Sequence, residues 1–113
     1  MSDGFEELLV VITRFATGVS VRVSGDVDLA SVETLRAALD GKLDGTTGDV
    51  DLDASGITFC DSVGLGALLS ARGALLAAGR ALRLVDPSPC VRRLLQITAT
   101  SELFGVRNPP PAP

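Results

Sequence analysis

The chain has 113 residues, of which 46% are hydrophobic, and a formal net charge of −4, so we expect one folded globular domain rather than a disordered chain. The acidic balance argues against a nucleic-acid partner, because a DNA-binding face needs basic side chains to replace phosphate counterions. The sequence has no histidine, tryptophan or tyrosine. Histidine-based catalysis, a Ser-His-Asp triad and histidine-ligated zinc are therefore excluded, and no metal or cofactor is expected.

The two cysteines, Cys60 and Cys90, lie far apart in apolar segments and lack metal-ligand spacing. We interpret them as reduced, buried side chains of a cytoplasmic protein. The chain does not open with the basic and apolar segments of a signal peptide. Its most apolar stretch, 63–82, is interrupted by Arg72 and Arg80, which favours a half-buried helix over a membrane span, so no direct membrane insertion is expected.

The first predicted element is an antiparallel hairpin. Residues 8–15 and 19–23 are short and rich in β-branched side chains, which favour strands. Thr17 and Gly18 between them suit a tight turn. The following segment, 24–31, is interpreted as a loop.

Ser31 is expected to cap a helix that runs to about Leu43, with Glu33 in the first turn, where negative charge is favoured. Apolar residues at spacings of three and four predict one buried stripe on this helix, formed by Val32, Leu35, Leu39 and Leu43.

A turn cluster at 44–49 separates this helix from the next predicted strand, 50–55, in which apolar residues alternate with aspartates. Residues 57–60 continue the apolar stretch. The next helix is expected from about 63 to 78, ending at Gly79, because glycine is common just after a helix.

The last elements are a strand at 81–85, a short helix started by Ser88 as cap and Pro89 at its first position, and a closing segment at 100–106. Residues 108–113 are expected to be a disordered Pro-rich tail. The short helix is expected to turn apolar residues inward and arginines outward, namely Val91, Leu94 and Leu95 against Arg92 and Arg93.

Strands that alternate with helices predict an α/β fold: a single domain over 1–107, with a mixed, mostly parallel sheet of four to five strands and helices packed against it. Functional residues of such sheets gather at the carboxyl ends of the strands. The predicted order places Asp26, Asp28, Asp61 and Ser62 there.

Three interpretations of Ser62 remain open. It can serve only as the N-cap of the helix that follows. It can act as a nucleophile, although the chain has no histidine to activate it and its one lysine, Lys42, lies in another segment. It can also be the target of a kinase, because a phosphate at a helix start is tolerated by the helix dipole while disturbing a partner surface.

Gly64 and Gly66 lie in the first turns of this helix, where glycine is unfavourable, and close approach by another backbone would compensate for them. A helical wheel separates a face of small residues, Gly66, Ser70, Gly73 and Ala77, from a bulky face, Leu65, Leu68, Leu69, Leu75, Leu76 and Gly79. The small face can pack on a neighbouring helix of the same molecule or receive a partner.

Three segments resemble the STAS domain, which is shared by bacterial anti-sigma factor antagonists and the cytoplasmic parts of sulfate transporters. They are VRVSGDVDLASVETLRAAL (21–39), VDLDASGITFCDSVGLGALLSA (50–71) and SPCVRRLLQITATSELFGV (88–106). The Asp-Ser-x-Gly-Leu-Gly stretch is the most specific of the matching motifs.

The resemblance implies an anti-sigma factor antagonist in a partner-switching circuit. The unmodified antagonist would bind an anti-sigma factor that is also an ATP-dependent serine kinase, and so release the sigma factor. Phosphorylation at the serine after the motif aspartate, here Ser62 after Asp61, would end binding, and a PP2C-type phosphatase would reverse it. The expected partner-binding residues are Asp26, Asp28, Asp61, Ser62, Val63, Gly64 and Gly66; Val63 replaces a second serine of many antagonists.

Two alternatives compete with this hypothesis. One is a STAS subunit without a phosphoswitch, such as a signalling scaffold or an accessory subunit of an ABC transporter. The other is a receiver-like protein, or a metal-dependent hydrolase, that uses Asp51, Asp53 or Asp61 with magnesium. A receiver needs a lysine after a late strand, and Lys42 precedes the third strand.

Overall fold

The computed structural model of the protein describes residues 8–41, 43 and 45–106. The predicted tail, 108–113, and Lys42 lie outside the described residues. In chain order the elements are β1 (Leu9–Phe15), β2 (Gly18–Val27), α1 (Val32–Gly41), β3 (Asp49–Cys60), α2 (Ser62–Ala77), β4 (Leu82–Val85), α3 (Pro89–Thr98) and the 3-10 helix η1 (Ser101–Phe104).

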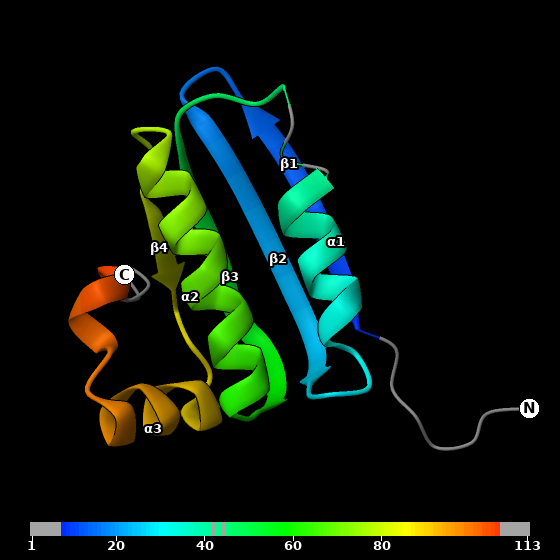
Figure 1. Ribbon diagram of the computed structural model, residues 1–113. Helices are drawn as coiled ribbons and strands as arrows, with labels where there is room; N and C mark the ends of the chain where they lie inside the picture. Colours follow the sequence, from blue (N-terminus) through cyan, green and yellow to red (C-terminus); the bar gives the residue numbers. More distant parts are fainter. Residues whose placement is uncertain (1–7, 42, 44, 107–113) are drawn as a thin grey trace, which may run out of the picture.

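The strands form one four-stranded sheet in the order β1-β2-β3-β4. β1 is antiparallel to β2, whereas β2, β3 and β4 are parallel. Each parallel strand is added on the same side of the previous one, so right-handed crossovers place both connecting helices on one face of the sheet. α1 and α2 lie side by side on that face (Figure 1). The predicted α/β class and the mixed, mostly parallel sheet are confirmed.

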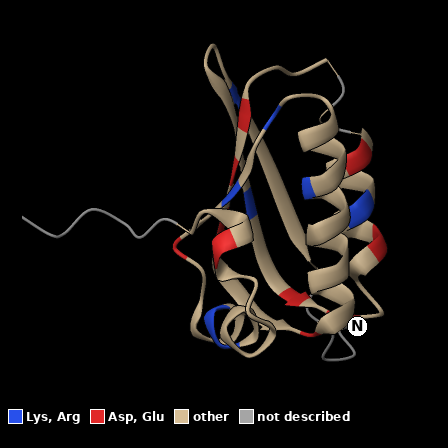
Figure 2. Cartoon of the chain, turned by 60° about the vertical axis from the view of Figure 1, so that its left-hand side comes forward, with Lys and Arg blue, Asp and Glu red and all other residues tan. Residues whose placement is uncertain are grey.

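The core lies between the sheet and these helices. Val21, Val50, Leu52 and Leu84 are fully buried beneath α1 and α2. The predicted apolar stripe of α1 is confirmed for Val32, Leu35 and Leu39, which are buried. The helix ends at Gly41 rather than at about Leu43, which is buried beyond its end. Alternate strand residues point to the opposite, open face of the sheet, where charged positions recur along the strands (Figure 2).

The predicted hairpin is confirmed, but two of its details are wrong. Gly18 already pairs with Phe15, so the turn consists of residues 16–17 rather than Thr17 and Gly18. β2 continues to Val27, so residues 24–27 form a strand rather than a loop. Gly25, at φ 110°, allows the register shift that keeps this end paired with β3.

Ser31 precedes α1 as predicted, but its hydroxyl forms hydrogen bonds with residues that come before it in the sequence rather than with the first turn of α1. The oxygen accepts from the Asp28 N–H (3.1 Å) and donates to the Asp26 carbonyl (2.6 Å). Ser31 therefore shapes the turn between β2 and the helix.

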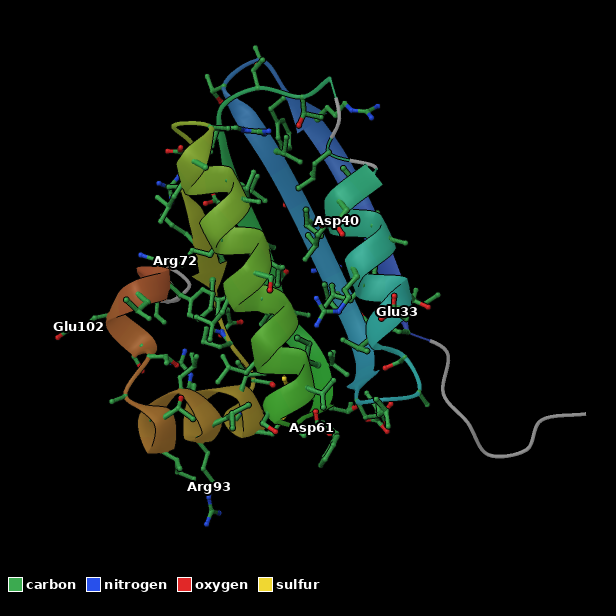
Figure 3. The ribbon with its side chains drawn as sticks, viewed as in Figure 1. Glu33, Asp40, Asp61, Arg72, Arg93 and Glu102 are labelled. Atoms are coloured by element: carbon green, nitrogen blue, oxygen red, sulfur yellow. The ribbon has the colours of Figure 1, made fainter. Side chains whose placement is uncertain are left out.

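The C-terminal segment closes the edge of the sheet at β4. Val91 and Leu95 of α3 are buried, Leu94 is half-buried and Phe104 of η1 is fully buried. Arg93 points away from the body of the protein (Figure 3), as predicted, whereas Arg92 is half-buried and lies 3.9 Å from the Asp86 carboxylate.

Ser88 and Pro89 start α3 as predicted, but the Ser88 hydroxyl makes no capping hydrogen bond and instead contacts the Cys90 sulfur at 3.3 Å. None of the helices in the described part of the chain is long and apolar enough to cross a membrane.

Candidate functional site

The predicted site residues lie together at the carboxyl ends of β2 and β3. We call this end of the sheet the carboxyl edge. Val27 pairs with Cys60, and the Asp61 N–H donates to the Val27 carbonyl at 3.4 Å. Asp61 consequently lies where α2 begins, beside the ends of both strands (Figure 3). The sheet edge therefore carries Asp26 and Asp28 from the β2 side and Asp61 and Ser62 from the β3 side.

Asp61, not Ser62, is the N-cap of α2. Its backbone is extended, and its Oδ1 accepts hydrogen bonds from the Val63 N–H (3.0 Å) and the Gly64 N–H (3.2 Å). The interpretation of Ser62 as the N-cap is therefore wrong. Aspartate and serine cap helices about equally well, so sequence alone could not choose between neighbours.

Ser62 is the first residue of α2 and is exposed. Because Asp61 supplies the cap, the fold does not require the Ser62 hydroxyl for that purpose. The residue lies at the positive end of the dipole of a 16-residue helix, where added negative charge is tolerated.

Asp26 and Asp28 are held by groups that carry no charge. The Thr58 hydroxyl of β3 donates to Asp26 Oδ1. Asp28 Oδ1 accepts from the Ala30 N–H (3.0 Å) and the Ser31 N–H (3.2 Å), which fixes the turn before α1. Both side chains are half-buried, and hydrogen bonds to neutral donors leave their negative charge at the edge.

Gly64 is where the start of α2 meets the strand ends. A Cβ at this position would lie 2.7 Å from Val27 Cγ1 and 2.9 Å from Cys60 Sγ. The close approach that the sequence suggested for a partner's backbone is thus made by the protein itself. Gly64 sets how deeply the first turn of α2 sits on the sheet.

Gly66 has different surroundings. A Cβ there, or at Gly73, would meet no atom within 4 Å outside its own turn. Ser70 and Ala77 on the same face are exposed. Internal packing of this small-residue face on a neighbouring helix is therefore wrong, and the face is open to solvent.

The predicted bulky face is only partly confirmed. Leu65, Leu68 and Leu75 are buried, but Leu76 is 47% exposed. Arg72, which interrupts the apolar stretch, donates from Nε to the Leu103 carbonyl at 2.7 Å and ties α2 to η1.

Two exposed apolar residues at this edge were not predicted as site residues. Leu29, in the turn after β2, is 77% exposed, and Phe59, near the end of β3, is 47% exposed. Leu29 lies among polar turn residues, so its exposure could have been predicted from the sequence. Phe59 lies in an apolar run that resembles a core strand, so its exposure could not be read from sequence. Val63, beside Ser62, is half-buried against the core.

The chemistry available at the edge does not include a reactive thiol. Burial, together with smaller effects of the nearby Cys90 and Asp61, raises the pKa of Cys60 to about 12. The thiol is therefore protonated at neutral pH and unsuited to nucleophilic attack. Cys60 and Cys90 are both free cysteines.

The carboxylates of the receiver-like alternative are already paired. Asp51 accepts from Arg83 at 3.0 Å, and Asp53 accepts from Arg22 at 3.3 Å, while Asp61 caps α2. Within the residues that the structure describes, no group of three or more His, Cys, Asp or Glu side chains could hold a metal ion. The geometry thus gives no support to a magnesium-dependent phosphoacceptor.

Comparisons with known proteins agree with this architecture. The family model described as Mlab, STAS domain, matches residues 13–105. The curated anti-sigma F factor antagonist of Lysinibacillus sphaericus is 34% identical over 92 residues, which cover 80% of this chain and 76% of that protein.

Two solved structures have the same fold. The unphosphorylated anti-sigma factor antagonist SpoIIAA superposes with a TM-score of 0.73 at 23% identity, covering 90% of this chain and 89% of that chain. An anti-sigma factor antagonist from Mycobacterium paratuberculosis gives a TM-score of 0.79 at 22% identity, covering 89% and 86%. The family match, the curated relative and the fold together establish that the chain belongs to the STAS-domain family.

Proposed function

We propose that this protein is an anti-sigma factor antagonist that is switched by phosphorylation of Ser62. The unphosphorylated form binds an anti-sigma factor and so releases a sigma factor; the phosphorylated form does not bind. The observation that carries the proposal is the exposed hydroxyl of Ser62 at the start of α2, next to an aspartate that already caps the helix. The similarity to a curated anti-sigma F factor antagonist supports it.

The fold should tolerate the modification. A phosphate on Ser62 adds about −1.5 to −2 charges at neutral pH, at the helix end where the dipole favours an anion. The buried contacts of Gly64 and the cap made by Asp61 involve other atoms. Modification should therefore change the surface without unfolding the domain.

A partner should not tolerate it. The edge already carries Asp26, Asp28 and Asp61, so the phosphate would concentrate negative charge on one small surface. A partner matched to the neutral hydroxyl would face a new dianion, and such a mismatch can cost several kcal/mol. Since about 1.4 kcal/mol is tenfold in affinity, this is sufficient for a switch.

We assign the docking surface to the edge around Ser62. Leu29 and Phe59 supply exposed apolar side chains, as is common at the centre of interfaces. Gly66 lies one turn along α2 from Ser62 and lets a partner's backbone approach the helix. Val63 and Gly64 would act mainly by shaping this surface, because they contact the core.

The modifying enzymes follow from the same proposal. The anti-sigma factor would be the serine kinase, and a PP2C-type phosphatase would remove the phosphate. The protein itself would be a substrate and regulator rather than a catalyst, acting in the cytoplasm without a cofactor.

The test is to incubate the protein with its cognate anti-sigma factor and ATP, and to map phosphate by mass spectrometry. We expect one phosphate, on Ser62, and none in Ser62→Ala. Ser70→Ala, an exposed serine farther along α2, is the matched control and should be phosphorylated normally. Phosphate on another residue, or equal labelling of Ser62→Ala, would contradict the proposal.

A second candidate is a STAS module that binds its partner without a phosphoswitch. This candidate is supported by the fold match to the Slc26a9 anion transporter, which has a TM-score of 0.59 at 18% identity. That chain carries the fold within a transporter. The module matches only 21% of that chain. Stable binding to a partner with no kinase-dependent mass change would favour this candidate.

A further inference from the structure

The two outer strands of the sheet have differently protected edges. β4 is only four residues long, and η1 lies against it; a Cβ added at Gly105, which follows η1, would lie 3.6 Å from Arg83 Cγ. β1 is seven residues long and pairs with β2 in unbroken register from Leu9 to Phe15. It forms the right-hand margin of the sheet in Figure 1. A long, regular edge strand presents main-chain N–H and C=O groups that can pair with another strand.

β1 carries exposed or half-buried apolar side chains on both of its faces. On the open face of the sheet, Leu9, Val11 and Phe15 are between 56% and 59% exposed. On the helix-bearing face, Val10 and Ile12 are only half-buried and line an open groove of about 280 Å³. Proteins usually protect such edges with charged side chains, especially lysine, with proline or with a bulge. β1 contains one charged residue, Arg14, and neither a proline nor a bulge.

The strand is complementary to a second copy of itself. If two β1 strands pair antiparallel about a two-fold axis at Ile12, all seven residues are paired, which no other register achieves. Leu9 then lies opposite Phe15 of the partner subunit, and Val11 opposite Thr13 of the partner subunit. The one charged residue, Arg14, lies opposite Val10 of the partner subunit, so like charges are not directly opposed.

We propose that two copies of this chain associate through antiparallel β1 strands and join their four-stranded sheets into one continuous eight-stranded sheet. The occupant is a second copy because the strand is self-complementary. The association closes at two subunits because β1–β1 pairing leaves only the two β4 edges, and η1 lies against each of them. Pairing also places the exposed apolar side chains of β1 beside side chains of the second copy on the same face of the joined sheet.

The dimer is independent of the proposed switch. β1 is separated from β3 and α2 by β2, so pairing through β1 leaves the edge around Ser62 uncovered. Ser62→Ala and Ser62→Glu should therefore dimerise as the native protein does, and the failure of one proposal would not remove the other.

Sedimentation equilibrium of the full chain over a range of concentrations tests the proposal. We expect a monomer–dimer equilibrium that Val11→Glu weakens by at least about tenfold, because each dimer loses the contact twice. The variant should still fold, since Val11 is exposed and pairs across the strands with Arg22. Ile97→Glu, at an exposed apolar residue of α3, is the control and should dimerise normally.

A native protein that stays monomeric up to about 1 mM would overturn the proposal. Val11→Glu that dimerises normally while folded by circular dichroism, or Ile97→Glu that disrupts the dimer, would overturn it as well.

The register has its own test. In the proposed dimer, Ile12 faces its own copy, so Ile12→Cys should form a disulfide-linked dimer in oxidised glutathione. Thr34→Cys, on the exposed side of α1, should not. The absence of cross-linking in a folded Ile12→Cys variant, or equal cross-linking of both variants, would contradict this register.

Discussion

Two sets of aspartates in the same sheet have opposite surroundings. Each aspartate on the open face of β3 forms an ion pair with an arginine, whereas those at the carboxyl edge accept hydrogen bonds from neutral donors. The open-face set is Asp49, Asp51 and Asp53, and the carboxyl-edge set is Asp26, Asp28 and Asp61.

The aspartates of the open face therefore stabilise the fold, whereas those of the carboxyl edge keep a charge that a partner can meet. Arg83 lies 3.0 Å from both Asp49 and Asp51, so the open face is largely neutralised within the molecule. At the carboxyl edge the negative charge stays at the surface, beside Ser62. We therefore expect changes of charge to alter partner binding at the edge and mainly acid stability on the open face.

The largest expected effect comes from adding charge at Ser62. Ser62→Glu should weaken binding to the anti-sigma factor by about a hundredfold, because a new anion joins an acidic surface. Ser62→Ala should bind like the unmodified protein. Ser70→Glu, which adds the same charge to the same helix outside the edge, is the matched control for calorimetric titration; if it weakened binding equally, total charge rather than position would be the cause.

Gly64 and Gly66 lie near the same edge, but only Gly64 is packed against the core. Gly64→Ala should lower the free energy of unfolding by about 2 kcal/mol, because its Cβ would press against Val27 and Cys60. Gly66→Ala should raise it by about 0.5–1 kcal/mol, since alanine favours a helix and meets no neighbour. Urea unfolding measures both; equal effects would show that Gly64 is not a packing constraint.

Asp61 has two properties that variants can separate, namely the hydrogen bonds that cap α2 and its negative charge. Asp61→Ala should cost about 1 kcal/mol of stability by removing the bonds to Val63 and Gly64. Asp61→Asn keeps an oxygen that can cap, so its stability should stay near that of the native protein. If both variants were equally unstable in thermal melts, the negative charge rather than the cap would be responsible.

The smallest effect concerns acid stability on the open face. Hydrogen bonds from the Ala81 N–H and from Arg83 hold the pKa of Asp49 below its ordinary value. A carboxylate with a lowered folded-state pKa contributes stability above the unfolded pKa and loses it as the pH falls through the folded value. Asp49→Asn should therefore flatten the dependence of melting temperature on pH below about 4, and leave partner binding unchanged. A parallel pH dependence in the variant would show that other groups dominate.

The sequence predicted the order of elements because their signals are local. β-Branched side chains marked β1, alternation of apolar residues with aspartates marked β3, and the apolar stripe of Val32, Leu35 and Leu39 marked α1. It failed where the outcome depends on tertiary contacts. Residues 24–27 look like a polar loop, yet Val27 is buried and paired with Cys60, and Gly25 absorbs the change of register.

The site shows the same limit. The motif located Asp61 and Ser62, but neighbouring capping residues compete, and only the backbone decides that Asp61 takes the cap. The roles of Gly64 and Gly66 cannot be told apart in sequence, because they depend on whether Val27 lies beneath them. Exposure of Phe59 likewise cannot be told from the apolar run 57–60, in which Ile57 and Cys60 are buried.

The most direct measurement compares the anti-sigma factor affinity of the unmodified protein with that of the protein stoichiometrically phosphorylated on Ser62, by isothermal titration calorimetry. The account predicts saturable binding of the unmodified form and at least about a hundredfold weaker binding of the phosphorylated form, with both equally folded by circular dichroism. Equal affinity of the two forms would contradict it.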